Sequence, residues 1–334
     1  MSSSADNDSA EERELRQLRV AASDAGLDCR GNAEILSRRI RSYKQARVEQ
    51  AYRYLLVVDF EATCESQNPD NYQHEIIEFP LVLLDLHEGK VVDKFHTYCR
   101  PKLHPKLSEF CRQFTGIEQD VVDSAPSFPA ALAAVQAWLQ HSDALTEPLA
   151  LAADCQADVA TFLRLQCSLD GIPVPAWAHY WVNLRITFQR HYALERKLNL
   201  SGMLAALGLE FEGRPHCGLD DAVNVAKIAL QLAADGCRLL VNQRLDQNKS
   251  PYYWRPVYKA EAEAKLRSDA AAGGTTTSRQ RGRRGRRHAS PEAAAAEARL
   301  DDICDDETEE SLSDLLYLVN LRNKCGGAGG SSTR

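Results

Sequence analysis

Several features that mark whole classes of protein are missing from this 334-residue chain. No stretch approaches the roughly 18 continuous apolar residues that a membrane helix needs, so we expect no membrane partner. The ten cysteines form no Cys-x-x-Cys pair and follow no regular spacing, which argues against a zinc site and against a disulfide framework. The polar, acidic N-terminus lacks the apolar stretch of a secretion signal. These absences together predict an intracellular protein in a reducing compartment.

A positive net charge is missing as well. The chain has 40 Lys and Arg residues against 47 Asp and Glu, a formal net charge of -7, so it does not coat nucleic acid by bulk positive charge. Basic side chains do gather between residues 29 and 47. That segment holds Arg30, Arg38, Arg39, Arg41, Lys44 and Arg47 and a single acid, Glu34. Its local excess of positive charge predicts either a phosphate-contacting surface or an ordinary solvated helix face.

Composition and periodicity divide the chain into four segments. Residues 1–10 are predicted to be disordered, and residues 11–50 to form two helices around a short loop. Residues 52–240 combine strands with helices, and residues 248–334 form a low-complexity tail with basic and acidic parts. We expect the tail to be mostly disordered, apart from one short amphipathic helix near Leu312 to Leu321 that packs on a protein partner.

The segment 52–240 predicts an α/β domain with a mixed sheet flanked by helices. Apolar runs at 54–60, 79–86 and 90–100 are typical of strands in quick succession, and a hairpin turn separates the last two. Helices are then predicted at 107–114, 128–141, 159–169, 200–209 and 219–236, and a further apolar strand at 148–154 lies among them. In open sheets of this kind, functional side chains gather beyond the carboxyl ends of strands.

Carboxylates occupy such strand ends. Asp59 and Glu61 close the first strand, and Asp154 closes a later one. Because residues i and i+2 of a strand point to the same side, Asp59 and Glu61 crowd one face and repel each other unless a cation lies between them. Taken alone, such a pair is more often the solvated end of a strand. His216 lies in a loop rich in Gly and Pro, and Asp221 follows in the first turn of a helix. Four acids from separate segments thus have the pattern of a site for two divalent ions.

Four longer motifs carry a family resemblance: DFEATC, HEIIEFP, LSEFCRQFTGI and GRPHCGLDDA. Through them, residues 52–240 resemble the DEDD-type 3′-to-5′ exonucleases of the ribonuclease H-like superfamily, in the subgroup with a histidine five residues before the last Asp. More narrowly, they look like the histone-mRNA 3′-end exonucleases, also known as the enhanced-RNA-interference exonucleases. Residues 11–50 look like the SAP helical hairpin that the same family carries before its nuclease domain.

The resemblance implies a catalytic site and a cofactor. It places the metal acids at Asp59, Glu61, Asp154 and Asp221 and the general base at His216, five catalytic residues in all. Two Mg²⁺ ions are implied, with Mn²⁺ as the alternative, because hard oxygen ligands select both. The expected reaction releases nucleoside 5′-monophosphates from RNA 3′ ends. One departure concerns the contact with the terminal nucleotide: the family pattern Asp-Gly-x-Trp-Asp is DCQAD here, with Cys155 for Gly and Ala157 for Trp.

The resemblance also implies that the partner is RNA with a free 3′ end, in a stem-loop or a duplex with an overhang. Arg30 matches an arginine of the family's RNA-binding loop, and Arg38, Arg39 and Lys44 would add phosphate contacts. Histone mRNA, the 3′ end of 5.8S ribosomal RNA and small interfering RNA stay open as targets. A DNA-directed exonuclease and a catalytically silent RNA-binding adaptor are the alternative functions. The basic run at 279–288 predicts a nuclear import signal or an auxiliary RNA-binding arm, so cytoplasmic and nuclear locations are expected, with the nucleolus left open.

Overall fold

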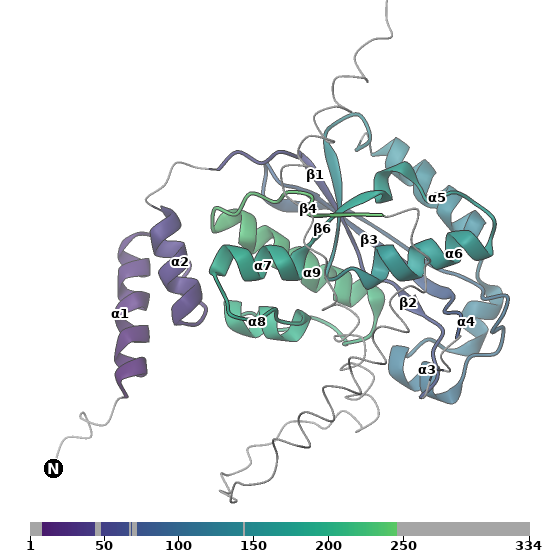
Figure 1. The fold of residues 1–334 in the computed structure, drawn as a ribbon, viewed down its shortest axis with the longest axis horizontal. Helices are drawn as coiled ribbons and strands as arrows, with labels where there is room; N and C mark the ends of the chain where they lie inside the picture. Colours follow the sequence, from purple (N-terminus) through teal and green to yellow (C-terminus); the bar gives the residue numbers. More distant parts are fainter. Residues whose placement is uncertain (1–8, 44–47, 67, 69–71, 143, 246–334) are drawn as a thin grey trace, which may run out of the picture.

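The computed structural model describes residues 9–43, 48–66, 68, 72–142 and 144–245 (Figure 1). Lys44, the basic run at 279–288, the expected helix near Leu312 and the rest of the predicted tail lie outside these ranges. Within the described ranges, no helix is both long and apolar enough to cross a membrane.

Among the described residues, seven strands form one mixed sheet. They are β1 (Tyr54–Val58), β2 (Glu61–Ala62), β3 (Ile76–Asp85), β4 (Lys90–Tyr98), β5 (Leu149–Ala153), β6 (Tyr180–Asn183) and β7 (Gln243–Arg244). The sheet runs in the order β2-β3-β1-β5-β6-β7, and β4 also pairs with β3. β1 and β5 are parallel, as are β5 and β6, whereas β3 is antiparallel to both β1 and β4. The α/β class with a mixed sheet, expected from the sequence, is therefore confirmed.

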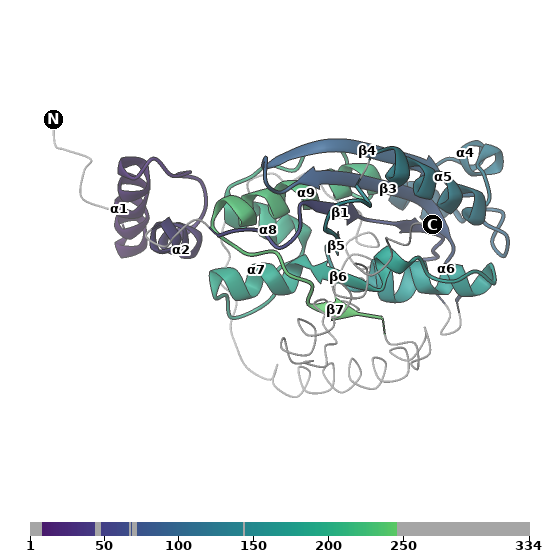
Figure 2. The ribbon, with the colours of Figure 1, turned by 90° about the horizontal axis from the view of Figure 1, so that it is seen from above.

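Helices cover both faces of this sheet. They are α3 (Glu109–Thr115), α4 (Gln119–Ser124), α5 (Phe128–His141), α6 (Arg164–Leu169), α7 (Leu184–Tyr192), α8 (Leu200–Leu207) and α9 (Gly218–Ala234). A π-helix, η1 (Ala157–Leu163), runs into α6, and a 3₁₀ turn, η2 (Ala176–Ala178), precedes β6. Figures 1 and 2 show α7, α8 and α9 together on one side of the sheet and α5 and α6 on the other.

The central strand β1 shows how both faces are filled. Leu55 and Val57 pack into the core that includes α7, α8 and α9, whereas Leu56 and Val58 pack into the core that includes α5. Successive strand residues point to opposite faces, and the strand is apolar throughout because both faces are covered. Continued past Val58, the same alternation puts Asp59 on the face that α9 covers.

The N-terminal hairpin consists of α1 (Ala10–Asp24) and α2 (Ala33–Tyr43). Ser9 caps α1: its side chain accepts a hydrogen bond from the Glu12 N–H, and the Glu12 side chain accepts one from the Ser9 N–H. This capping box orders two residues that the sequence assigned to a disordered segment, so the helix begins one residue before the predicted 11–50 segment.

The hairpin shares the core of the sheet domain. Ile35 on α2 is fully buried in the core that holds α8 and α9. The Asn32 N–H donates a hydrogen bond to the Ala206 carbonyl of α8 at 3.0 Å. Gly208, which caps the end of α8, lies so close to the hairpin loop that a Cβ at this position would be 2.8 Å from the Gly31 nitrogen. The hairpin loop and α2 are therefore packed on the domain, not merely tethered to it.

The domain ends later than the sequence indicated. β7 pairs antiparallel with β6 through Tyr180 with Arg244 and Trp181 with Gln243. The last strand of the sheet therefore lies beyond residue 240, the expected boundary. The elements β6, α7 and α4 were likewise absent from the expected series.

Candidate active site

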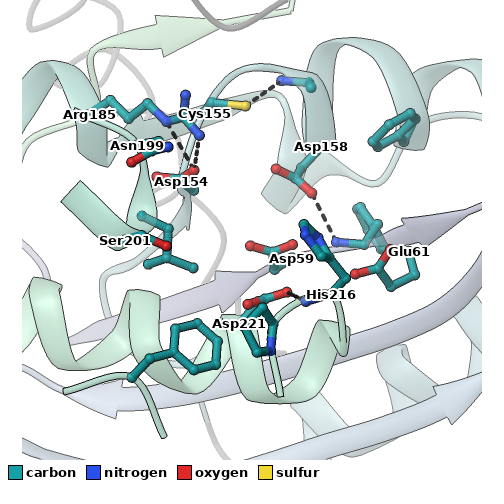
Figure 3. Close-up of a pocket in the computed structure, with 16 residues that line it drawn as sticks. Asp59, Glu61, Asp154, Cys155, Asp158, Arg185, Asn199, Ser201, His216 and Asp221 are labelled. Atoms are coloured by element: carbon teal, nitrogen blue, oxygen red, sulfur yellow. Dashed lines mark hydrogen bonds and ion pairs between the residues drawn. The ribbon is translucent and has the colours of Figure 1, made fainter. Parts of the chain in front are cut away.

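One pocket of about 110 Å³ lies at the carboxyl ends of the parallel strands β1 and β5, and Figure 3 shows the side chains around it. The five residues that the sequence singled out for chemistry all line this pocket: Asp59, Glu61, Asp154, His216 and Asp221. Carboxyl ends of neighbouring parallel strands meet at one edge of a sheet, which is why residues about 100 positions apart in the chain can meet here.

Asp59 and Glu61 reach the pocket from strand ends. Asp59 follows β1 directly, and Glu61 opens β2 with its side chain 8% exposed. Burial raises the pKa of Asp59 well above its usual value, and the negative charge of Asp158 raises it further. Burial also raises the pKa of Glu61, and the charge of Asp221 adds to that shift. This part of the pocket therefore concentrates negative charge away from water.

The start of α9 carries Asp221 and is fixed by a buried carboxylate from β3. Glu78 accepts hydrogen bonds from the N–H groups of Gly218 at 3.0 Å and Leu219 at 3.2 Å, two donors that a helix start otherwise leaves unpaired. Gly218 is required at this point, because a Cβ would lie 2.8 Å from the Asp59 carbonyl oxygen. Asp221 lies within the first turn of α9, and burial raises its pKa to about 8.

His216 occupies the loop before α9 in an unusual backbone conformation. Its φ is 63°, in the left-handed region that few non-glycine residues adopt. Its N–H donates a hydrogen bond to Asp221 Oδ2 at 2.9 Å, and its ring stacks on Phe114 with the centroids 4.0 Å apart. One ligand atom from each of Glu61, His216 and Asp221 lies within 4.8 Å of the others. These three side chains are close enough to meet around one small ion.

Asp154 is held differently from the other acids. It follows β5 directly, and its Oδ2 accepts a hydrogen bond from Arg185 Nε at 2.9 Å within a buried ion pair. Its Oδ1 has no hydrogen-bond partner among the described residues. Across the described part of the chain, the ion pairs include none with Asp59, Glu61 or Asp221. Arg185 thus compensates the charge of Asp154.

Asp158 is a pocket carboxylate that the sequence analysis missed. It lies in η1, is 6% exposed, and accepts a hydrogen bond from the Phe60 N–H at 2.9 Å. Burial raises its pKa to about 7, and the charge of Asp154 contributes. Figure 3 shows its carboxylate above Asp59 in the pocket. The available signal was the second acid of DCQAD, which follows Asp154 by four residues.

Cys155 and Ala157 line the pocket where the family pattern has Gly and Trp. Both are buried, and the Ala157 N–H donates a hydrogen bond to Cys155 Sγ at 3.4 Å. Seven further described cysteines, Cys29, Cys64, Cys99, Cys111, Cys167, Cys217 and Cys237, are free thiols. On this side of the pocket, Ala157 has no aromatic ring on which a nucleotide base could stack.

The side chains expected to contact RNA differ in their surroundings. Arg30 lies in the hairpin loop with its side chain 57% exposed, and it forms a salt bridge to Asp28 at 2.6 Å. Arg38 is half-buried, and its Nε has no hydrogen-bond partner among the described residues. Lys44 lies outside the described residues. Of the described members of the set, Arg30 presents the most accessible cation.

The prediction for Arg39 is wrong. Its side chain is 3% exposed, and its guanidinium donates hydrogen bonds to the two carboxylate oxygens of Asp235 at 2.7 and 2.9 Å. It also donates to the carbonyls of Asp28 and Arg30. Arg39 therefore ties the hairpin to the residue that ends α9 and is not available to a phosphate. Its position four residues after Ile35, on the apolar face of α2, was the signal for a packed side chain.

Comparison with known proteins places the chain in a family. The model of the Exonuclease family matches residues 56–229, which is more than half of the chain. Human 3′-5′ exoribonuclease 1 is 38% identical over 240 residues, which cover 69% of this chain and 69% of the human protein. The chain belongs to the exonuclease family. The 3′-5′ exonuclease eri1 of Schizosaccharomyces pombe is 34% identical to this exonuclease over 269 residues, covering 69% of the chain and 90% of the yeast protein.

Solved structures support the same assignment. The nuclease domain of 3′hExo, described as a DEDDh family member bound to rAMP, is 41% identical with a TM-score of 0.58, over 59% of this chain and 100% of that chain. A structure described as 3′-end specific recognition of histone mRNA stem-loop by 3′-exonuclease is 39% identical with a TM-score of 0.58, over 60% and 90% of the two chains. This exonuclease is thus a 3′-to-5′ exoribonuclease with the DEDDh, ribonuclease H-like fold that the motifs predicted. The assignment of its hairpin as a SAP domain stays a prediction.

Proposed function

We propose that this exonuclease uses two divalent metal ions, Mg²⁺ in the cell, to release nucleoside 5′-monophosphates from RNA 3′ ends. One observation carries the proposal: a set of acids with raised pKa values gathers in one pocket, where the described lining residues include no equal number of basic side chains. These acids are Asp59, Glu61, Asp158 and Asp221. Like charges withdrawn from water at such proximity favour protonation, unless cations compensate them.

The donor set fits a hard divalent cation. Carboxylate oxygens are the ligands that Mg²⁺ and Mn²⁺ prefer. We assign the ligand role to Asp59, Glu61, Asp158 and Asp221. Asp154, which the sequence analysis selected instead of Asp158, already has its charge compensated by Arg185. When bound, the ions would neutralise charge on the scissile phosphate and lower the pKa of the attacking water.

His216 is proposed as the general base. An imidazole with an unperturbed pKa of about 6.5 accepts a proton efficiently near neutral pH. The side chain lies on the pocket wall, and the hydrogen bond from its N–H to Asp221 ties its backbone to the proposed ion site. A water activated beside Asp221 would therefore be within the reach of the imidazole that takes its proton.

The proposed substrate is RNA with a free 3′ end next to a stem-loop or duplex, as in histone mRNA, 5.8S ribosomal RNA precursors or small interfering RNA. Two observations support this choice. A structure of a related 3′-exonuclease concerns recognition of the histone mRNA stem-loop. In this chain, the exposed Arg30 belongs to a hairpin that is packed against the nuclease domain, so a stem held there would be at a defined place relative to the pocket.

The test uses a 5′-labelled stem-loop RNA with a single-stranded 3′ tail, incubated with the full chain and Mg²⁺. We expect stepwise shortening from the 3′ end and nucleoside 5′-monophosphates as the products identified by mass spectrometry. Asp59→Asn should remove nearly all activity while the circular dichroism spectrum stays that of the wild type. Full activity of this variant would refute the metal assignment.

Two further comparisons address the alternative functions. A DNA of the same sequence should be shortened much more slowly than the RNA, and equal rates would favour the DNA-directed enzyme. Tight RNA binding without any shortening would favour the silent adaptor. His216→Ala should lower turnover far more than RNA affinity, whereas equal losses of both would assign His216 to binding.

A further inference from the structure

The loop that carries His216 is fastened to α3, which lies about 100 residues earlier in the chain. α3 ends at Thr115, and Gly116 follows with a φ of 74°, the left-handed conformation that commonly terminates helices. The last carbonyl groups of a helix have no partner within the helix. A distant side chain from the His216 loop supplies the partner here.

That side chain is Arg214, two residues before His216. Its guanidinium donates hydrogen bonds to the carbonyls of Thr115 at 2.8 Å, Gln113 at 3.0 Å and Phe114 at 3.2 Å. A cation at the carboxyl end of a helix is also favoured by the helix dipole. Arg214 therefore satisfies three carbonyls at once, which fixes the distance between the loop and the end of α3.

The Arg214 guanidinium occupies space that the side chain of any residue larger than glycine at position 116 would fill. A Cβ added to Gly116 would lie 1.4 Å from an Arg214 terminal nitrogen, so this close approach requires glycine. On the other side, the Arg214 N–H donates to Asp220 Oδ2 at 2.8 Å, in the first turn of α9. The loop is thus attached to α3 by the Arg214 side chain and to α9 by its backbone.

The same helix end presents an aromatic ring to the imidazole. Phe114 is 9% exposed, and its ring stacks on that of His216 with centroids 4.0 Å apart and planes inclined by 26°. Phe110, one turn earlier in α3, stacks on Phe114 with centroids 5.5 Å apart. The Phe114 ring therefore packs on one face of the imidazole and restricts its rotation, while the hydrogen bond to Asp221 holds the His216 backbone.

We propose that Arg214 and Phe114 are positioning residues for His216: Arg214 latches the loop to the end of α3, and Phe114 on that helix holds the imidazole facing the pocket. Neither residue needs to touch RNA for this role. The inference rests on the proposed function of His216 as general base, and it adds a segment, α3, that the acid motifs do not include.

The first experiment measures kcat and KM on a short single-stranded RNA for Phe114→Leu and Phe114→Ala. Leu keeps most of the volume but removes the flat ring, so Phe114→Leu tests the stack even if the Ala variant folds poorly. We expect kcat to fall by about 10-fold to 100-fold, the range for a misplaced catalytic group, with KM changed little. Phe110→Ala is the matched control: it removes a ring from the same helix without removing the ring on His216, and it should retain most of the kcat.

The second experiment combines Phe114→Leu with His216→Ala. A residue that acts only through His216 has nothing left to position in that background, so the second substitution should change kcat by less than about twofold. A general structural role of Phe114 would instead lower kcat by the same factor in both backgrounds, and that outcome would overturn the proposal.

The third experiment tests the latch. Arg214→Gln should lower kcat in wild-type protein and have little effect in the His216→Ala background, and Arg214→Lys should restore part of the loss because an ammonium can still donate to the carbonyls. Wild-type kcat in Arg214→Gln would overturn the latch. If His216→Ala keeps the wild-type kcat, the proposed role of His216 as general base fails. If His216→Ala loses activity but the Phe114 and Arg214 variants keep it, the positioning proposal fails and the role of His216 stands.

Discussion

Replacing Asp158 by asparagine should stabilise the metal-free protein, and the gain should grow with pH. The folded state raises the pKa of Asp158 from 3.8 to about 7 through burial and neighbouring charge. Between those two pH values the folded protein holds a proton that the unfolded chain has released. The favourable contribution of protonated Asp158 to the free energy of unfolding is therefore fully present below pH 4 and is lost as the pH rises through about 7. Asparagine has the same shape and never ionises, so the variant avoids this loss.

The magnitude follows from the size of the shift. One unit of pKa corresponds to about 1.4 kcal/mol, so the shift from 3.8 to about 7 amounts to about 4 kcal/mol over the whole range. Between pH 5 and pH 7, the free energy of unfolding of Asp158→Asn should rise by about 2 kcal/mol relative to the wild type, because the slope of about 1.4 kcal/mol per pH unit flattens as the pH reaches the folded-state pKa. Added Mg²⁺ should shrink the difference at pH 7, because a bound cation stabilises the ionised carboxylate of the wild type.

The assay is urea unfolding followed by far-ultraviolet circular dichroism at pH 5, 6, 7 and 8 with a chelator present. Asp24→Asn, which changes an exposed carboxylate on α1, serves as the matched control and should show a difference that is flat with pH. A flat difference for Asp158→Asn as well would show that Asp158 does not lie in a buried field of negative charge, and the reasoning about the pocket would fail with it.

Three further predictions concern the ligand set, the hairpin and the start of α9. In Mg²⁺ titrations of activity, Asp158→Asn should raise the half-maximal Mg²⁺ concentration more than Asp154→Asn does, and the reverse order would return the ligand role to Asp154. Arg39→Met should lower the free energy of unfolding by about 3 kcal/mol, because the buried carboxylate of Asp235 loses its cation. Arg41→Met, on the exposed face of α2, should have almost no effect, and equal effects would contradict the buried ion pair. Gly218→Ala should lower kcat strongly, since its Cβ would displace the start of α9, and a fully active variant would show that the close approach is dispensable.

The sequence predicted those elements whose pattern is local. The run 128–141 has the composition of a helix with a proline in its first turn, and α5 matches it to the residue. The strands β1, β3 and β5 are nearly continuous apolar runs, as expected of strands buried on both faces.

The elements it missed depend on tertiary contacts. β6 has four residues, and α7, which follows at once, buries seven of its nine, so it shows no alternation between an apolar and a polar face. β7 has two residues and is defined by its pairing with β6. A short strand of this kind leaves no pattern in sequence.

The pocket residues also divide into those that local sequence patterns located and those that depend on tertiary contacts. Strand ends and motif spacing were enough to bring Asp59, Glu61, His216 and Asp221 to one pocket. They leave open which of the two acids of DCQAD is a ligand, and our proposal of Asp158 depends on Arg185, a residue 31 positions away that forms an ion pair with Asp154. The packing of Arg39 likewise depends on Asp235, which no local pattern links to the hairpin.

A crystal structure of the full chain with Mn²⁺ and adenosine 5′-monophosphate would show whether the pocket acids bind two ions, because the anomalous signal of manganese locates the ions independently of the protein. We expect two ions in the pocket, coordinated at about 2.0–2.4 Å by oxygens of Asp59, Glu61, Asp158 and Asp221. Ions bound elsewhere, or a pocket whose carboxylates coordinate none under these conditions, would contradict it.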